Sequence, residues 1–278
     1  MHTTMVLPDY HIHTPLCKHA AGDMDSYVVR AIDIGLVEIG FSDHMPLMPE
    51  PEFCMGYDDL PRYRDAVFEL RERYAGRISI KFGCEMDIVH DRMDEIHSIL
   101  DMYPFDYVIG SLHYLDGWPF DQKRYRGVFE TGDVSEIYSR FFAAVREVVR
   151  TGVFDIVGHV DNIKRMGFRP SSGMNAFYEE IAAVCAEQDV AVEVNTGGFD
   201  TVCREQYPSA MFLAVLNRYG VPVTIGSDAH APGQVGRHFN RVEPVLRDAG
   251  YASISYFTAR RRRNVPLEFA GRRGEAGG

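Results

Sequence analysis

The stretch from Asp9 to His19 holds the first residues whose types and spacing could bind a metal ion. Residues two apart in an extended chain point to the same side, so Asp9, His11 and His13 would share one face. His19 follows in a loop, after a proline that breaks regular structure, and this loop can fold back over the pair. Neutral imidazole is the commonest protein ligand for transition metals. A half-buried strand with solvent-facing histidines would carry the same pattern, so the rest of the chain has to decide.

Residues of the same kind stand at the ends of later apolar segments. The sequence predicts strands over residues 37–42, 78–85, 107–113, 154–159, 190–195 and 221–226, after a first strand that leads into Asp9. All but one of these later strands end at, or shortly before, an imidazole or a carboxylate. The residues at these ends are His44, Glu85, His113, His159, Asp228 and His230.

Helices are predicted between the strands, over residues 24–35, 59–74, 92–102, 175–187, 209–219 and 242–249, and from the Asp133 cap onward. Strand and helix alternate without an internal repeat, a linker or a change of composition. This pattern favours one parallel α/β barrel over residues 1–270, with residues 271–278 as a disordered tail. The carboxyl ends of barrel strands converge on one face, where active sites are built. We therefore expect the nine imidazole and carboxylate residues to meet there.

Composition excludes several classes of function. The chain has 29 lysines and arginines against 40 acidic residues, a net charge of −11, which argues against non-specific nucleic-acid binding. The five cysteines are odd in number and scattered, which favours a reducing compartment. No signal peptide is visible, and no run approaches the roughly 20 apolar residues of a membrane span. We expect a cytoplasmic protein with no membrane partner. The sequence leaves its oligomeric state open.

Seven histidines and two carboxylates are too many ligands for one zinc ion, because catalytic zinc sites use three protein ligands and a water. The set suits two or three divalent ions, with Glu85 or Asp228 able to bridge a pair. Imidazole and carboxylate together suit Zn, Fe or Mn, and the sequence does not choose among them.

Six segments, DYHIH, SDH, GCE, SLH, GHVD and SDAH, resemble in this order the PHP (polymerase and histidinol phosphatase) superfamily. Four longer segments, HTPLCKHA, IGSLHYL, DIVGHVDNIKR and GSDAHAPGQVGR, are similar to its stand-alone histidinol-phosphatase branch, and the resemblance runs from Asp9 to Arg237. It implies a distorted (β/α)7 TIM-like barrel with a multinuclear metal centre. By resemblance, one ion would bind His11, His13, Glu85 and Asp228; a second would bind Glu85, His113 and His159; and a third would bind His19, His44 and His230.

The resemblance also implies a reaction, the hydrolysis of L-histidinol phosphate to L-histidinol and phosphate in histidine biosynthesis. A water shared between the ions would ionise near neutral pH and attack the phosphorus as a metal-bridged hydroxide. Glu85, Asp228 and His230 are the expected catalytic residues, although the sequence does not identify the general acid. Two alternatives stay open: a PHP phosphoesterase that acts on another small monoester or on a nucleic-acid end, and a non-catalytic metal-binding barrel. The acidic balance disfavours nucleic acid.

Substrate contacts are weaker predictions. Arg165 and Arg237 could grip the phosphate, since guanidinium matches its oxygens, or could be solvated surface arginines. Asp161 could face the substrate's ammonium or imidazole group, or could only cap a helix. Asp9 could hydrogen-bond a ligand histidine.

Two further segments carry predictions. Residues 195–198 resemble a family loop in which a serine is expected at Gly197 or Gly198, and this departure could alter how the substrate is seated. The run from Arg260 to Arg263 is interpreted as a solvated basic surface.

Overall fold

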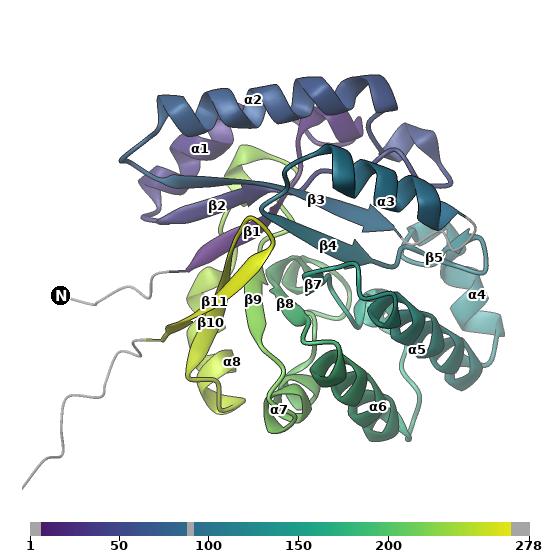
Figure 1. The fold of residues 1–278 in the computed structure, drawn as a ribbon. Helices are drawn as coiled ribbons and strands as arrows, with labels where there is room; N and C mark the ends of the chain where they lie inside the picture. The colour runs from purple at the N-terminus through teal and green to yellow at the C-terminus, as the bar shows by residue number, and fades with distance from the viewer. Residues whose placement is uncertain (1–6, 88–91, 268–278) are drawn as a thin grey trace, which may run out of the picture.

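The computed structural model describes residues 7–87 and 92–267. Its centre is a seven-stranded parallel sheet with the strand order β1-β2-β3-β4-β7-β8-β9 (Figure 1). Nearly every residue of these strands is buried, because a parallel sheet of this kind is covered on both faces. The strands are β1 Pro8–Ile12, β2 Glu38–Phe41, β3 Ser79–Asp87, β4 Tyr107–Ser111, β7 Ile156–Val157, β8 Ala191–Asn195 and β9 Val223–Gly226.

The sheet nearly closes on itself where β1 meets the end of β9. The His13 N–H donates to the Ala229 carbonyl at 2.9 Å, and the Ala229 N–H donates to the His11 carbonyl at 3.0 Å. Ladder pairing along these two strands is limited to an isolated bridge between Ile12 and Ala229. The barrel is therefore distorted at this seam, and the prediction of a seven-stranded barrel is confirmed.

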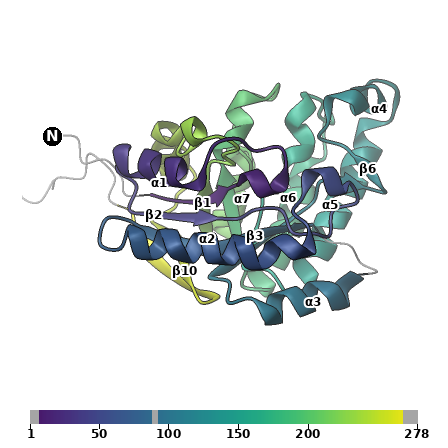
Figure 2. The ribbon, with the colours of Figure 1, turned by 90° about the horizontal axis from the view of Figure 1, so that it is seen from above.

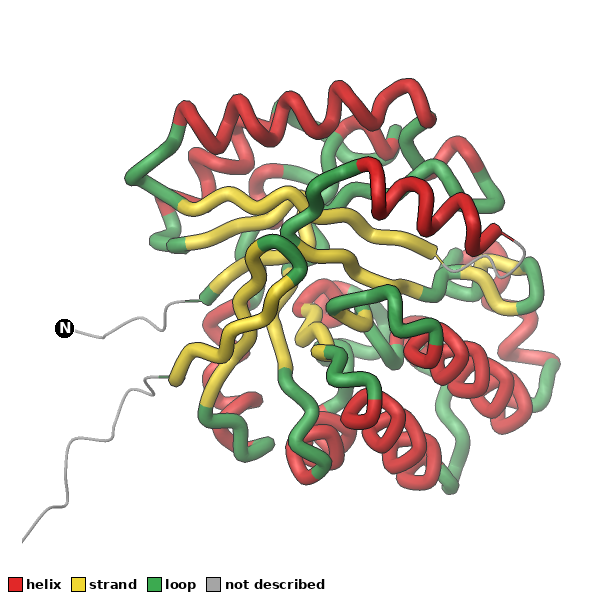
Figure 3. The backbone as a smooth tube through the Cα atoms, viewed as in Figure 1, coloured by secondary structure: helices red, strands yellow, loops and turns green. Residues whose placement is uncertain are grey.

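Helices form the outer layer around the strands (Figure 3). The predicted α5 begins after Asp133, whose carboxylate accepts hydrogen bonds from the N–H groups of Ser135 at 2.8 Å and Glu136 at 3.3 Å. Seen from above, α2 runs along β2 and β3 (Figure 2), where Tyr63 donates to the Gly83 carbonyl. The helices are α1 Met24–Asp33, α2 Leu60–Arg73, α3 Met93–Met102, α4 Arg126–Thr131, α5 Val134–Arg150, α6 Met174–Glu187, α7 Ala210–Arg218 and α8 Val242–Asp248.

Two antiparallel hairpins were not predicted from the sequence. One, β5 Tyr114–Leu115 with β6 Trp118–Pro119, follows β4 at the carboxyl end of the barrel. The other, β10 Ser253–Thr258 with β11 Arg261–Pro266, lies beside β1 and β9 (Figure 1). Its turn reaches the amino-terminal end of the barrel, where the Ala259 N–H donates to Asp106 at 3.1 Å.

The interpretation of Arg260 to Arg263 as a solvated basic run is wrong for Arg262, whose side chain is 19% exposed and donates to the Asp189 carbonyl at 2.6 Å, and it is wrong for Arg260. This residue lies in the turn of the β10–β11 hairpin, and its guanidinium pairs with Asp155 and donates to the Val153 carbonyl at 2.6 Å. Asp155 lies just before β7, so the pair joins the hairpin to the amino-terminal end of the barrel. The sequence run alone contained no sign of this distant partner.

None of the helices in residues 7–87 and 92–267 is long and apolar enough to cross a membrane. The predicted disordered tail, residues 271–278, lies outside the described residues.

Candidate metal centre

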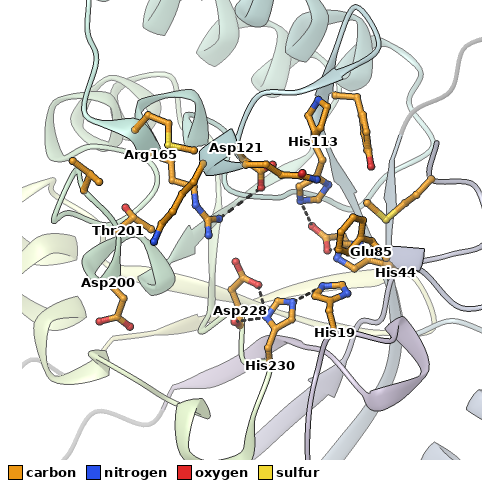
Figure 4. Close-up of a pocket in the computed structure, with 18 of the residues that line it drawn as sticks. His19, His44, Glu85, His113, Asp121, Arg165, Asp200, Thr201, Asp228 and His230 are labelled. Carbon is orange, nitrogen blue, oxygen red and sulfur yellow. Dashed lines mark hydrogen bonds and ion pairs between the residues drawn. The ribbon is translucent and has the colours of Figure 1, made fainter. Parts of the chain in front are cut away.

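Glu85 stands at the centre of the predicted cluster, at the carboxyl end of the barrel (Figure 4). The side chain comes from the end of β3 and is 1% exposed. Its Oε2 lies 3.2 Å from His11 Nε2 and 3.1 Å from His44 Nδ1. Its Oε1 lies 3.0 Å from His159 Nε2 and 3.7 Å from His113 Nε2. One carboxylate thus faces four imidazoles that arise from four different strands or strand ends.

The remaining predicted residues continue the cluster beyond His13. Asp228 Oδ1 lies 3.3 Å from His13 Nε2, and the rings of His13 and His230 stack with their centroids 4.0 Å apart. His230 Nε2 in turn lies 3.0 Å from His19 Nε2. The structure therefore brings all nine predicted residues together, because the carboxyl ends of the strands converge.

Several ring and carboxylate atoms in this cluster are buried without a hydrogen-bond partner among the described residues. They are His11 Nε2, both ring nitrogens of His13, His44 Nδ1, Glu85 Oε2 and His159 Nδ1. A buried polar atom left unpaired costs free energy, so such a concentration of them indicates a bound group.

The unpaired atoms belong to sets whose ligand atoms lie within 4.8 Å of one another. Imidazole nitrogen mixed with carboxylate oxygen is the donor set of Zn, Fe and Mn sites. The residues present therefore fit divalent metal ions. Four of the sets hold only histidines and acids: His11, Glu85 and His159; His44, Glu85 and His113; His11, His13 and Asp228; and His13, His44 and His230; a fifth set, His13, Cys17 and Asp43, includes a thiol.

The protonation states of Glu85 and the surrounding imidazoles depend on one another. Burial would raise the pKa of Glu85, but the imidazoles of His11 and His113 hold it well below its usual range. Burial lowers the pKa of His44 well below its usual value, which leaves the neutral ring that a metal needs. The ionised Glu85 favours positive charge nearby, and a proton or a divalent cation can supply that charge.

Three acids that were not predicted from the sequence lie behind the imidazoles, and two of them, Glu193 and Asp87, hydrogen-bond a ring nitrogen. Glu193 Oε1 lies 2.7 Å from His11 Nδ1, and Asp87 Oδ2 lies 2.9 Å from His113 Nδ1. Asp43 Oδ1 lies 3.5 Å from His13 Nδ1. A carboxylate on the second ring nitrogen fixes the tautomer and orientation of a ligand histidine. Glu193 could have been identified from the sequence as a single acid within an apolar strand, β8, because a buried acid needs a partner.

A cavity of about 660 Å³ opens beside the cluster, a size typical of small-molecule sites. Glu85 and Asp228 line one side with four of the histidines, His19, His44, His113 and His230, and Arg165, Asp121, Asp200 and Thr201 lie across from them (Figure 4). The Arg165 side chain is 42% exposed, with Nη1 3.7 Å from Asp121 Oδ2. Arg165 thus lines the cavity, and its contact with phosphate stays a prediction.

Asp161 does not occupy the position that was predicted. It is 1% exposed, and its carboxylate accepts hydrogen bonds from Lys164 Nζ at 2.8 Å and from the Ser209 N–H at 2.9 Å. It lies behind the cavity wall because the lysine three residues later pairs with it. A contact between Asp161 and the substrate is not supported by this position.

Arg237 and Asp9 also make contacts other than those predicted. Arg237 does not line the cavity, because its guanidinium donates to the carbonyls of Ser227 and Asp228 at 2.7 and 2.8 Å. Asp9 bonds no imidazole within residues 7–87 and 92–267. Instead it accepts from the N–H groups of Ser227 at 2.8 Å and Gly236 at 3.0 Å, which ties β1 to the loop after β9.

Comparison with known proteins agrees with this arrangement. A family model described as "PHP domain" matches residues 9–197, and a second described as "PHP-associated" matches residues 211–249. The probable histidinol-phosphatase of Deinococcus radiodurans is 34% identical over 253 residues, 90% of this chain and 96% of that protein. The chain belongs to the PHP family, in the branch of the stand-alone histidinol-phosphatases.

Other relatives extend over most of both chains. The histidinol-phosphatase of Bacillus subtilis is 27% identical and covers 82% of this chain and 95% of its own. Among solved structures, the histidinol phosphate phosphatase of Lactococcus lactis, complexed with Zn, L-histidinol and phosphate, matches with a TM-score of 0.79. That match covers 92% of this chain and 98% of the other at 24% identity, and it shows the shared fold.

Proposed function

We propose that this protein hydrolyses L-histidinol phosphate to L-histidinol and inorganic phosphate with the help of two or three divalent metal ions. The observation that carries the proposal is the cluster of unpaired imidazole and carboxylate atoms around Glu85, beside a cavity that also holds Arg165. The names of the Deinococcus and Bacillus relatives support this substrate.

The ions would be held in three groups, of which two share the central carboxylate of Glu85. Glu85 would bridge between the His11, His13 and Asp228 set and the His113 and His159 set. His19, His44 and His230 would hold a third ion. When bound, divalent ions supply a nucleophilic water at neutral pH and neutralise charge on the phosphoryl group.

The residues of the chain would position the substrate and move protons. Arg165 faces the metal ligands from across the cavity, where its guanidinium can hold two phosphoryl oxygens. Asp228 and His230 present a carboxylate and an imidazole to the same space. We assign them to proton transfer between the attacking water and the departing alkoxide.

The leaving group, L-histidinol, carries an ammonium and an imidazole. Asp121 and Asp200 line the cavity apart from the metal ligands, and they replace Asp161 as candidates to face these cations. Two relatives from Clostridium botulinum strains, 26% identical over 88% of this chain, are named only as probable phosphatases. Another small monoester is therefore the second candidate substrate.

The test is phosphate release by metal-stripped protein that is re-supplied separately with Mn²⁺, Fe²⁺, Co²⁺ or Zn²⁺. L-histidinol phosphate is compared with other phosphate monoesters and with a 3′-phosphorylated oligonucleotide. We expect metal-dependent turnover with a strong preference for L-histidinol phosphate. Metal-dependent turnover of other esters alone would overturn the substrate and keep the centre. No turnover with any ion would overturn the enzymatic proposal and favour a non-catalytic metal-binding barrel.

A further inference from the structure

Arg237 was expected at the substrate, yet its guanidinium is committed to the backbone that carries Asp228. Nε donates to the Ser227 carbonyl at 2.7 Å and Nη2 donates to the Asp228 carbonyl at 2.8 Å. Nη1 lies 3.3 Å from Asp200 Oδ2, and the side chain is 17% exposed. The planar fork thus clamps two consecutive carbonyl groups at the end of β9 and has an acid on its outer side.

The backbone that Arg237 holds is in an unfavourable conformation. Asp228 has a φ of +55°, a left-handed conformation that costs free energy for a residue other than glycine. In this conformation its carboxylate Oδ1 lies 3.3 Å from His13 Nε2 and 3.9 Å from His11 Nε2. Relaxation of this backbone would move the carboxylate away from the two imidazoles with which it is proposed to share an ion.

Gly197 provides the room that the guanidinium occupies. A Cβ atom at Gly197 would lie 2.6 Å from Arg237 Nη2 and 3.0 Å from Asn195 Oδ1. Any side chain would therefore push on the clamp. The Gly197 N–H donates to Asn195 Oδ1 at 2.9 Å, so the glycine fits closely against a second polar group as well.

Residues next to Gly197 in the chain hold Arg237 and Asp228 in place. Thr196 donates its hydroxyl to the Arg237 carbonyl at 2.7 Å, which holds the arginine backbone against the end of β8. Asn195 Nδ2 lies 3.2 Å from Glu193 Oε2 and 3.5 Å from Asp228 Oδ2. The ends of β8 and β9 are thus joined through Arg237 and Gly197, directly behind the proposed ligand Asp228.

We propose that Arg237 and Gly197 act together as a positioning pair that holds Asp228 in its metal-binding conformation. This inference rests on the proposed metal centre and adds to it. In this assignment Arg237 supports the backbone of Asp228 and does not contact the substrate. Arg165 is then the arginine proposed to bind phosphate. It also gives a steric reason for the glycine at position 197, one of the two positions, 197 and 198, at which the family resemblance suggested a serine.

The experiment is a double-mutant cycle with Arg237→Met, Gly197→Ala and the double variant. Zn²⁺ affinity is measured by titration of the stripped proteins against a chromophoric chelator, together with kcat and KM at saturating Zn²⁺. We expect each single variant to weaken the affinity of at least one ion by about tenfold or more, as loss of a residue that orients a ligand does. The double variant should lose no more than the worse single variant, because both changes break one clamp.

Two comparisons separate this role from its alternatives. Arg165→Met should raise KM and leave Zn²⁺ affinity unchanged, and Arg237→Met should do the reverse. Arg237→Lys keeps the charge without the fork and should fall between wild type and Arg237→Met in affinity. If Arg237→Met keeps wild-type Zn²⁺ affinity, or if the two losses add fully in the double variant, the pair does not exist. Because affinity is measured without substrate, failure of the proposed reaction would not be confused with failure of this inference.

Discussion

The two ends of the barrel bury the same kinds of charged and polar groups and treat them differently. At the amino-terminal end, Asp106 accepts from the N–H groups of Phe82 at 3.0 Å and Ala259 at 3.1 Å and pairs with Arg71 at 2.6 Å. Asp155 accepts from the Val108 N–H at 2.8 Å and pairs with Arg260. The chain itself supplies every one of these partners.

At the carboxyl end, the cluster around Glu85 keeps ligand atoms that no described residue satisfies. A buried charge paired within the protein needs no further ligand, whereas one left unpaired lowers stability unless something else binds it. Both ends therefore contain buried acids, and residue types alone do not distinguish the structural end from the functional end. What differs is whether the protein supplies hydrogen-bond and ion-pair partners for the buried polar atoms. Four predictions test this difference.

The largest effect is expected from Glu85→Ala. Loss of the central carboxylate removes the proposed bridge between ions, so we expect phosphate release to fall by at least about a thousandfold, or roughly 4 kcal/mol in activation free energy. The metal-free variant should be less stable than metal-free wild type, because the imidazoles around position 85 lose the carboxylate that lies 3.0 to 3.2 Å from three of their nitrogens. Phosphate release and urea unfolding measure the two results. Activity retained in this variant, with its ions present, would contradict the centre.

Removal of metal should destabilise the protein. A ligand that binds only the native state at a thousand times its Kd contributes about 4 kcal/mol, which for a chain of this size is a fall in Tm of roughly 10 °C on chelation. Calorimetry with and without EDTA gives the shift. The Glu85→Ala variant is the control and should respond much less. Equal Tm values for holo and stripped wild type would show that the unpaired atoms are not a metal site.

At the other end of the barrel, Arg260→Met should lower stability and leave function intact. It strands the Asp155 carboxylate, whose side chain is 12% exposed, and we expect a loss of about 2 kcal/mol in the free energy of unfolding. Arg261→Met, on the exposed start of β11, is the matched control, with a change within about 0.5 kcal/mol. Urea unfolding and metal affinity are both measured. A fall in metal affinity for Arg260→Met would remove the distinction between the ends.

The smallest effect is expected from Arg165→Met within the cavity. Loss of one guanidinium contact to phosphate should raise KM about tenfold, near the lower end for a charged hydrogen bond, and should weaken inhibition by inorganic phosphate to a similar extent. Steady-state kinetics at saturating metal measure both constants. An unchanged KM together with unchanged phosphate inhibition would remove Arg165 from the substrate site.

The sequence was sufficient for the barrel and for the nine clustered residues, because both follow from local patterns. Apolar strands that end in histidine or acid, repeated along the chain, can only converge if the strands form a barrel. Several of the residues that were misjudged or missed depend on partners distant in the chain. Arg260 meets Asp155, which lies 105 residues away, and Glu193 lies 182 residues from His11. The Arg237 guanidinium lies outside the cavity, in space that is open because Gly197 has no Cβ. The local sequence around Arg237 gives no indication of this contact.

Phosphate release from L-histidinol phosphate, followed while stripped protein is titrated with Mn²⁺ or Zn²⁺, tests the central claim most directly. We expect no turnover without ions and a rate that rises and saturates at two or three equivalents per chain. The Glu85→Ala protein should stay inactive at every ratio. Turnover by the stripped protein, or a rate independent of the equivalents added, would contradict a metal centre at the carboxyl end of the barrel.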